Sequence, residues 1–352
     1  MITGRSMGIK SRAAVAMSGG VDSSVTALLL LEKGFSVVGV TMPTSPAAVD
    51  GAKRVAAHLG IEHVMADGIA PLFEEKVVQY FIGGYRAGLT PNPCVVCNRE
   101  IKYGALMDFS LGFADFFATG HYARVHRNEK GQYELWRGVD PAKDQSYVLY
   151  HMTQTRLARL ILPLGLMKKE EVRGLAEKAG LPFLRAESQE ICFIPGDDYR
   201  AFLKERCGEE AFVPGPIKTT SGRVVGRHQG LAFYTIGQRR GLGVALGKPA
   251  YVIGFALEEN ALIVGGQEEL KAGGLVAGDV SYIAGAAPGP EFAAWVQIRY
   301  NAAAVPAKVR PGDDNTATVV FAEPQRAVTP GQAAVFYDGE RVIGGGTILE
   351  GR

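Results

Sequence analysis

Cysteine is scarce in this chain, and long apolar runs are missing. The 352 residues include only four cysteines, Cys94, Cys97, Cys192 and Cys207, which is too few for a disulfide scaffold in a chain of this length. The most apolar run, VTALLLLEKG, is far shorter than the ~20 residues that span a bilayer. The first residues, MITGRSMGIKSRAA, carry charges but no apolar signal-peptide core. We therefore expect a cytoplasmic protein without membrane association.

Net charge and low complexity are also weak or absent. The formal net charge is +2, with 47% hydrophobic and 21% charged residues, a composition typical of soluble globular proteins. So small a net charge neither requires nor excludes a polyanionic partner. The length predicts two or three domains, and no internal repeat or low-complexity tract is evident.

Hydrophobic patterning divides the chain into an α/β part and a β part. Short valine-rich runs at 13–17 and 35–42 predict buried parallel strands. Helical patterns lie between and after them, at 23–34, 47–60, 71–87, 99–112, 153–164 and 168–180. After about residue 205, short alternating runs broken by Gly and Pro predict strands and hairpins. The sequence thus predicts a doubly wound parallel sheet (1–204), a central mostly β domain (205–270) and a C-terminal β-barrel (271–352).

The turn SGGVDSS at 18–24 lies between the first strand and the first helix. Its glycines let the backbone approach a ligand closely, and the N–H groups of a helix N-terminus favour an anion. The alternative is a capped turn without a ligand, with Asp22 or Ser23 as N-cap. No Walker A motif is present. The turn resembles the SGGxDS loop of PP-loop ATP pyrophosphatases, which implies ATP, Mg²⁺, an adenylated substrate and released pyrophosphate.

The cysteines leave three interpretations open. Cys97 closes a C-x-x-C behind Pro-Asn-Pro and is predicted near a helix N-terminus, where the thiol pKa falls. The cysteines could be inert small hydrophobes, or all four could bind zinc, although the second pair has poor spacing. In the third interpretation Cys97 and Cys192 carry out sulfur chemistry: one attacks a persulfide on the other, sulfide leaves and a disulfide remains. We expect Cys207 to be an exposed bystander.

Six motifs occur in order along the chain: AMSGGVDS, TPNPCVVCNREIKYG, ATGHYAR, GVDPAKDQSYVLY, SQEICFIPGDDYRAFL and YTIGQRRGLG. Together they resemble the tRNA-specific 2-thiouridylase family (MnmA/TrmU type) from about residue 12 to the end. The resemblance implies a tRNA-uridine 2-sulfurtransferase, which adenylates the C2 oxygen of the wobble uridine and replaces it with sulfur. Two other functions stay open. Another PP-loop ATP-dependent ligase would not need Cys97 and Cys192, and a non-catalytic iron–sulfur or RNA-binding protein would release no pyrophosphate.

The resemblance also implies roles for individual residues. Cys97 would be the nucleophile and Cys192 the persulfide carrier. The implied ATP-binding residues are Ala16, Met17, Ser18, Gly19, Gly20, Val21, Asp22, Ser23, Met42 and Gly120. The implied tRNA-binding residues are Asn92, Pro93, Cys94, His121, Lys143, Asp144, Gln145, Arg299, Tyr300 and Gln332. The partners would be tRNA and a sulfur donor, either a cysteine desulfurase, a relay protein or sulfide, and we expect a monomer.

The chain departs from the family pattern at two places, and it contains one basic segment. Cys94 stands where the family pattern leads us to expect an acidic residue. Cys94, Cys97 and Cys192 could therefore hold a [4Fe–4S] cluster with one open iron, an alternative to the persulfide route. The segment PTSPAAVDG after Met42 is shorter than expected, so closure of the nucleotide pocket or a partner contact would differ. Five cations and two aromatic residues, with no acidic residue, lie in 218–240, a pattern that favours RNA contact.

Overall fold

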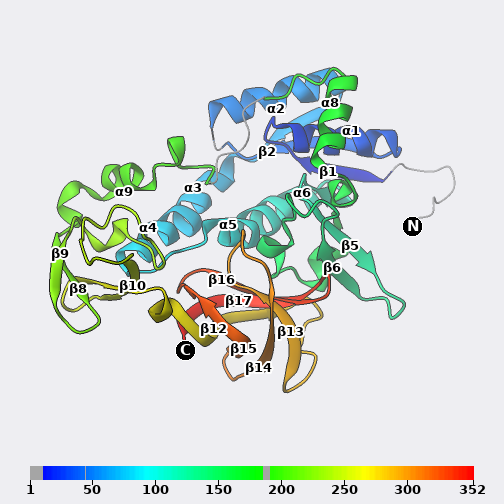
Figure 1. Cartoon of the computed structure of the whole chain (residues 1–352). Helices are drawn as coiled ribbons and strands as arrows, with labels where there is room; N and C mark the ends of the chain where they lie inside the picture. Colours follow the sequence, from blue (N-terminus) through cyan, green and yellow to red (C-terminus); the bar gives the residue numbers. More distant parts are fainter. Residues whose placement is uncertain (1–10, 44, 185–190) are drawn as a thin grey trace. The chain divides into compact units, whose positions relative to one another are not determined.

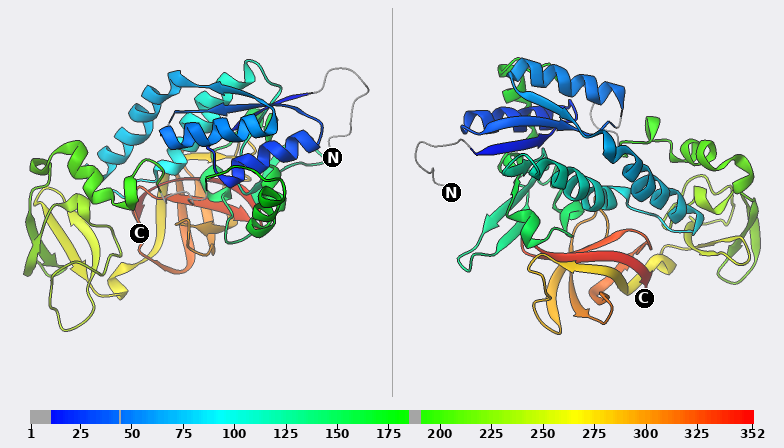
Figure 2. Two further views of the ribbon diagram at one scale, coloured as in Figure 1. Left: turned by 90° about the horizontal axis from the view of Figure 1, so that it is seen from above. Right: turned by 180° about the vertical axis from the view of Figure 1, so that it is seen from behind.

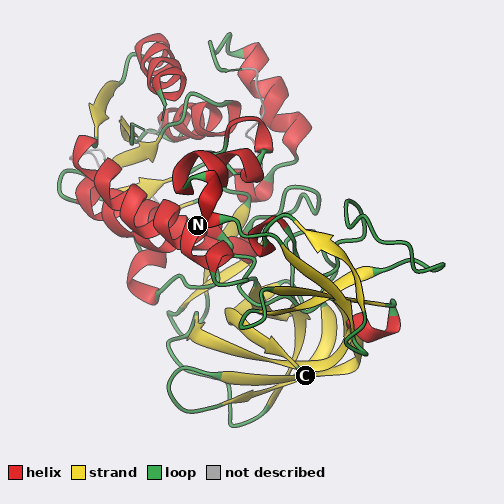
Figure 3. Cartoon of the chain, turned by 90° about the vertical axis from the view of Figure 1, so that its left-hand side faces the viewer, coloured by secondary structure: helices red, strands yellow, loops and turns green. Residues whose placement is uncertain are grey.

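The computed structural model describes residues 11–43, 45–184 and 191–352 (Figure 1). The chain forms two units, each of which contains two stretches of sequence. Unit 1 comprises Met1–Phe73 and Cys97–Ser188, and unit 2 comprises Glu74–Val96 and Gln189–Arg352. Helices surround a small sheet in unit 1, and strands predominate in the C-terminal part of unit 2 (Figures 2 and 3).

The centre of unit 1 is a five-stranded parallel sheet in the order β3-β2-β1-β4-β7. Its strands are β1 (Arg12–Ala16), β2 (Ser36–Thr41), β3 (Glu62–Met65), β4 (Phe116–Ala118) and β7 (Leu160–Ile161). The strand order reverses between β1 and β4, since the chain adds β2 and β3 on one side of β1 and β4 and β7 on the other. Ligands of such sheets bind beyond the carboxyl ends of the strands at this reversal. The predicted doubly wound sheet is confirmed, and its switch point lies where the SGGVDSS turn leaves β1.

Local sequence signals explain where the helices of unit 1 begin and end. In α2, for example, the Ser45 hydroxyl accepts a hydrogen bond from Ala48 N (3.2 Å) and Pro46 occupies the first turn. Gly60, at φ +66°, ends this helix. The helical segments of unit 1 are α1 (Val21–Glu32), α2 (Pro46–Leu59), η1 (Asp67–Ile69), α3 (Ala70–Phe73), η3 (Cys97–Leu106), α6 (Met107–Leu111), η4 (Ser146–Leu149), α7 (Gln154–Leu157), η5 (Pro163–Leu166) and α8 (Lys169–Lys178).

The prediction of one helix over 153–164 is wrong. The helix α7 ends at Leu157, and the chain then enters β7, where Leu160 pairs with Phe117 and Ile161 with Ala118, before the short 3-10 helix η5 begins at Pro163. A short apolar run fits a helix and a buried strand equally well, and here pairing with the sheet edge decides. The antiparallel hairpin of β5 (Ala123–Arg127) and β6 (Tyr133–Arg137) was not predicted either.

Unit 2 contains a four-stranded sheet in the order β10-β11-β8-β9. Its strands are β8 (Gly215–Thr219), β9 (Val224–His228), β10 (Tyr251–Ala256) and β11 (Ala261–Gly265). The helical segments of the same unit are η2 (Glu74–Val78), α4 (Gln79–Arg86), α5 (Pro93–Val96), η6 (Pro195–Asp197), α9 (Tyr199–Cys207), η7 (Glu209–Ala211), η8 (Leu231–Phe233) and η9 (Glu268–Leu270). The expected β-rich character after residue 205 is therefore confirmed.

A closed six-stranded antiparallel barrel ends the chain. Its strands are β12 (Lys271–Tyr282), β13 (Phe292–Gln297), β14 (Val305–Pro311), β15 (Ala317–Arg326), β16 (Ala333–Asp338) and β17 (Arg341–Gly351). They pair in the order β12-β15-β14-β13-β16-β17, and β12 also pairs with β17, which closes the barrel. Closure leaves no free strand edge. Within the described ranges, no helix is long and apolar enough to cross a membrane.

Candidate active site

The SGGVDSS turn forms an uncapped helix start at the switch point of the sheet. Gly20 is the N-cap residue of α1, and within the described part of the chain no side-chain cap hydrogen bond forms at this helix start. The alternative of a turn capped by Asp22 or Ser23 is therefore wrong. The Ser23 hydroxyl instead donates to Gly20 O (3.1 Å) and accepts from Ser18 N (3.2 Å). First-turn N–H groups without a capping side chain, together with the helix dipole, suit a phosphate.

Two glycines of this corner are required by packing. Gly19 has φ +74°, and a Cβ on it would lie 2.7 Å from the Gly51 backbone. A Cβ on Gly120, in the loop after β4, would lie 2.9 Å from Asp22 C and Cβ. Gly120 was predicted as a residue that the nucleotide approaches closely. The structure gives it an additional role, because its lack of a side chain lets the β4 loop press against the first turn of α1.

An ion pair holds the acidic residue of the turn. Lys169 Nζ lies 2.7 Å from both carboxylate oxygens of Asp22, and the Tyr122 hydroxyl donates to Asp22 Oδ1 at 2.7 Å. Burial, and then the neighbouring Asp22 carboxylate, raise the pKa of Tyr122, so this hydroxyl stays protonated as a donor. Sequence reasoning missed Lys169 and Tyr122. Lys169 lies 147 positions from Asp22 and carries no motif of its own.

Asp144 and Gln145, predicted as tRNA contacts, are part of the same corner. Gln145 Oε1 accepts from Tyr122 N (3.0 Å), and Gln145 N donates to Tyr122 O (2.9 Å). The Asp144 side chain is only 7% exposed and pairs with Arg137 Nη1 at 2.7 Å. Through these contacts, Asp144 and Gln145 stabilise the loops that position Tyr122, the partner of Asp22. Lys143 precedes them and is partly exposed, and its predicted contact with tRNA stays a prediction.

Cys97 is buried beside a polar network in unit 1. Burial, and to a smaller extent the electrostatic effect of Cys97, raises the pKa of Tyr103. The Tyr103 hydroxyl lies 2.9 Å from His121 Nδ1 and 3.0 Å from Thr119 Oγ1. Burial, and secondarily Lys102, hold the pKa of His121 well below its usual value, so its imidazole is neutral. His121 is 7% exposed, and the structure thus places this predicted tRNA contact inside the fold.

The helix that carries the C-x-x-C motif begins earlier than predicted. Asn92 Oδ1 accepts from Val95 N (3.3 Å), and Pro93 is the first residue of α5. Helical backbone then continues through η3, so Cys97, predicted near the helix N-terminus, lies one turn further into the helix than expected. Cys94, which is half-buried, occupies the first turn instead. The Pro-Asn-Pro sequence supplies an N-cap followed by a proline in the first turn, a signal that could have placed this boundary.

Cys192 is exposed and lies next to an anchored aromatic residue. The Phe193 ring packs edge-on against Phe81 (5.5 Å between centroids) and Phe202 (5.5 Å) within unit 2. The chain around Cys192 is therefore fixed at one side while the thiol stays accessible. Residues 185–190, which end two positions before Cys192, lie outside the described part. Cys207, expected to be exposed, is half-buried at the end of α9.

The barrel residues predicted to contact tRNA make internal contacts. Arg299 Nη2 donates to Ala327 O (2.7 Å), Thr329 Oγ1 (2.6 Å) and Ile236 O (3.3 Å). Gln332 Nε2 donates to Thr90 O (2.9 Å), two residues before Asn92. Arg299 therefore joins the segment around Ile236 to the barrel. Gln332 binds the backbone at Thr90, just before the C-x-x-C motif. Tyr300 is 41% exposed and remains accessible to a ligand.

The remaining predicted nucleotide residues lie near the same edge of the parallel sheet. Ala16 ends β1, Met17 N donates to Val40 O (2.8 Å), and Met42 follows the last residue of β2. Val21 is the first residue of α1. Unit 1 thus brings together the turn, Met42, Gly120 and the Asp22 ion pair. No group of three or more His, Cys, Asp or Glu side chains suited to a metal ion occurs among the described residues.

Sequence comparisons extend this picture over the chain. A tRNA methyl transferase HUP domain matches residues 11–196, a tRNA methyl transferase PRC-barrel domain matches 200–266, and an aminomethyltransferase beta-barrel domain matches 272–348. The parallel sheet with an uncapped glycine-rich turn and the match over residues 11–196 define a HUP-domain protein that carries two further β modules.

Relatives with similarity over the full chain identify the family. The tRNA-specific 2-thiouridylase MnmA of Desulforudis audaxviator is 55% identical over 95% of this chain and 97% of its own length. The proteins of the same name from Carboxydothermus hydrogenoformans and Heliobacterium modesticaldum are 51% and 48% identical. They cover 96% and 97% of this chain and 98% and 93% of their own. The chain belongs to the tRNA-specific 2-thiouridylase family.

Proposed function

We propose that this protein is an ATP-dependent tRNA-uridine 2-sulfurtransferase that acts on the wobble uridine. The observation that carries the proposal is the match, at 55% identity and over nearly the whole length of both chains, to a protein named tRNA-specific 2-thiouridylase. The uncapped start of α1 and the two cysteines of different accessibility support it. The substrates are ATP and tRNA, and the site of use is the cytoplasm.

ATP makes the uridine C2 oxygen a leaving group. This oxygen attacks the α-phosphorus, pyrophosphate leaves, and the oxygen later departs as part of AMP. The phosphates would lie against the first-turn N–H groups of α1, next to Gly19 and Gly20. Mg²⁺ neutralises phosphate charge when bound. Asp22 offers the carboxylate oxygens that Mg²⁺ prefers, and it is the acidic residue of the turn.

Sulfur is transferred through Cys97 and Cys192. An external donor loads a persulfide on Cys192, whose exposure supports this role. The Cys97 thiolate attacks the inner sulfur of that persulfide, the outer sulfur leaves as hydrosulfide, and a Cys97–Cys192 disulfide forms. Hydrosulfide attacks C2 of the adenylated uridine and expels AMP. A thiol reductant then restores both cysteines, and burial of Cys97 keeps water away from the reacting groups.

Other features of the proposal concern organisation. Residues 1–204 would form the catalytic domain, 205–270 a central tRNA-binding domain and 271–352 a barrel domain, in a monomer. A [4Fe–4S] cluster on Cys94, Cys97 and Cys192 has no support from the described side chains, since no metal-binding group occurs among them. The proposal therefore routes sulfur through the persulfide.

The test is reconstitution with purified components. The protein is incubated with ATP, Mg²⁺, unmodified tRNA, sulfide or a persulfide donor, and a thiol. Thiolated tRNA is separated on a mercury-containing gel, and pyrophosphate is measured in parallel. We expect 2-thiouridine at the wobble position. Cys97→Ser and Cys192→Ser should abolish persulfide-dependent thiolation but retain tRNA-dependent pyrophosphate release, while Cys207→Ser, the matched control, should behave as wild type.

Different failures identify different alternatives. Pyrophosphate release by the wild type and by both cysteine variants that needs no tRNA and yields no thiolated tRNA would indicate another PP-loop ligase. Absence of pyrophosphate release from the wild type would indicate a non-catalytic RNA-binding protein. Stoichiometric iron and acid-labile sulfide after anaerobic purification, lost together with thiolation in Cys94→Ser, would replace the persulfide route with the cluster route.

A further inference from the structure

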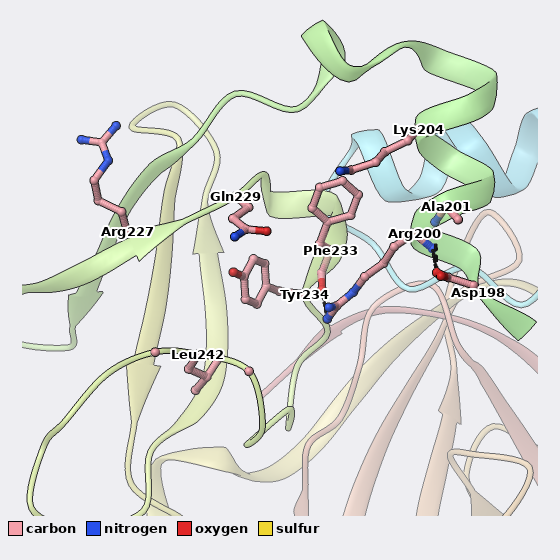
Figure 4. A pocket seen from close by; sticks show the side chains of 11 residues that line it. Asp198, Arg200, Ala201, Lys204, Arg227, Gln229, Phe233, Tyr234 and Leu242 are labelled. Atoms are coloured by element: carbon pink, nitrogen blue, oxygen red, sulfur yellow. Dashed lines mark hydrogen bonds between the residues drawn. The ribbon is translucent and has the colours of Figure 1, made fainter.

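Unit 2 contains a polar pocket that includes none of the predicted site residues. Its volume is about 380 Å³, and it lies between α9 and the segments around β9 and η8 (Figure 4). The residues that line it are Asp198, Arg200, Ala201, Lys204, Arg227, Gln229, Phe233, Tyr234, Gly241, Leu242 and Gly243. A volume of this order suits a small ligand or a single nucleotide.

Internal hydrogen bonds preform one wall of the pocket. Arg200 Nη2 donates to Phe233 O (2.8 Å), and the Tyr199 hydroxyl donates to the same oxygen (3.1 Å). The Phe233 ring stacks on Phe212 at 4.6 Å, and Lys204 Nζ lies 5.7 Å from the Phe233 ring centroid. Because Phe212 and Lys204 already contact this ring, it does not offer a free face to an aromatic ligand. Recognition here must depend on charge and hydrogen bonds.

The charge balance of the lining favours an anion. Three cations, Arg200, Lys204 and Arg227, line the pocket with one carboxylate, Asp198. Asp198 Oδ1 accepts from Arg200 N (3.1 Å) and Ala201 N (3.0 Å) at the start of α9, so this carboxylate is occupied as a helix cap. Lys204 has only a 3.4 Å contact with the exposed Glu209. Among the described residues, no carboxylate pairs with Arg227.

Further cations precede the loop that closes the pocket. Gly241 and Gly243 have φ of +73° and +65°, and they flank Leu242, which is 6% exposed. These backbone conformations suit glycine and turn the buried leucine into the pocket wall. Arg239 and Arg240 immediately precede this turn, and both are exposed. Lys218, from the same basic segment of the sequence, pairs instead with Glu259 and does not contribute.

Two neutral polar side chains complete the lining. Gln229 and Tyr234 lie between Arg227 and Leu242 (Figure 4). The Tyr234 ring is 7% exposed and packs edge-on against His228 at 6.0 Å, which fixes its direction. A phenol and a carboxamide provide donors and acceptors that match the ribose hydroxyls and base edges of RNA.

We propose that this pocket binds one nucleotide of the tRNA, distinct from the uridine that is modified. Lys204 contacts its phosphate, Arg227 on the opposite side contacts the neighbouring phosphate of the chain, and Gln229 and Tyr234 contact its ribose or base edge (Figure 4). The inference rests on the proposed function and adds a substrate contact to it. A phosphate contact of this kind positions an RNA, whereas contacts to the base edge discriminate among sequences.

The test compares charge removal at the pocket with matched charge removal elsewhere. The double variant Lys204→Gln/Arg227→Gln is compared with Lys308→Gln/Arg310→Gln on β14, where both cations lie beside Glu291. The tRNA affinity is measured from 50 to 300 mM salt by filter binding, and thiolation kinetics are measured with the same tRNA. Melting curves verify that both double variants are folded.

We expect the slope of log affinity against log salt concentration to fall by about one to two in the pocket variant only. Its KM for tRNA should rise at least fivefold, with kcat within twofold of wild type. Tyr234→Phe should raise KM without a change in slope. A pocket variant that matches the control in slope and KM overturns the inference, as does an unchanged KM in Tyr234→Phe.

Two further outcomes keep the inference separate from the proposed function. Normal tRNA binding with turnover lost only when a protein sulfur donor is used would make the pocket a protein interface and overturn the inference. Absence of thiolation by the wild type would refute the proposed function. In that case the salt slope of the pocket variant still decides whether the pocket binds RNA.

Discussion

Replacing Lys169 with methionine tests the ion pair that holds Asp22 at the start of α1. The ammonium lies 2.7 Å from both carboxylate oxygens, and the Lys169 and Asp22 side chains are 14% and 32% exposed. At an effective dielectric constant of about 20, the Coulomb attraction at this distance is roughly 6 kcal/mol. Desolvation of both charges and the ordering of the lysine chain offset most of this energy. We expect a net loss of about 1–3 kcal/mol in the free energy of unfolding.

A double-mutant cycle isolates this contact. Unfolding in urea is followed by far-UV circular dichroism for Lys169→Met, Asp22→Asn and the double variant, without nucleotide. We expect a coupling energy of about 1–3 kcal/mol. Lys168→Met is the matched control, since Lys168 is the neighbouring lysine and is exposed. It should change stability by less than about 0.5 kcal/mol. A coupling below about 0.3 kcal/mol would refute the view that Lys169 holds Asp22.

Three other predictions follow from packing, hydrogen bonding and burial. Gly120→Ala should destabilise the protein by about 1–3 kcal/mol and weaken ATP binding, because the new methyl group meets the first turn of α1. Gly174→Ala is the control, because the added Cβ would meet no atom outside its own helix within 4 Å. It should be neutral or stabilising when both variants are compared by thermal melts and nucleotide titrations. Arg299→Lys should cost about 1–3 kcal/mol in urea unfolding, because the lysine side chain is shorter and its ammonium cannot reach the position from which Nη2 donates to all three oxygens. An unchanged midpoint would contradict this. Burial, with Arg99 as a second cause, lowers the pKa of His151 to about 3. The neutral form of His151 therefore contributes fully to the free energy of unfolding above about pH 6.5. This contribution is lost as the pH falls toward 3, by up to about 1.4 kcal/mol per pH unit. His151→Phe should flatten stability against pH in that window, and equal slopes for the two proteins would refute the assignment.

The local signals of the sequence located most elements of unit 1. Valine-rich runs alternate with helical patterns, and this alternation predicts a parallel sheet. Ser45, Gly34 and Gly60 mark helix ends. Such signals can be read from the sequence because they depend only on residues close together in the chain. The prediction at 153–164 is wrong for the converse reason. Leu160 and Ile161 are apolar in any conformation, and only the free edge of β4 makes them a strand.

The site shows the same division. The turn SGGVDSS and the two cysteines can be identified from the sequence, because their residue types and spacing form recognisable motifs. The roles of Lys169 and Tyr122 cannot be predicted from the sequence, since their partner Asp22 is 147 and 100 positions away in the chain. Nor could the sequence show that Gln145 supports Tyr122 or that Gln332 holds Thr90.

By itself, the sequence determined the order of modules, the position of the glycine-rich turn after the first strand and the positions of the cysteines. The tertiary structure decided which polar residues are available to a ligand and which are engaged within the fold. His121, Asp144 and Arg299 are occupied internally, whereas Arg227 lines a pocket. The physical reason is that a side chain's function depends on its burial and partners, and these are set by chain segments far apart in sequence.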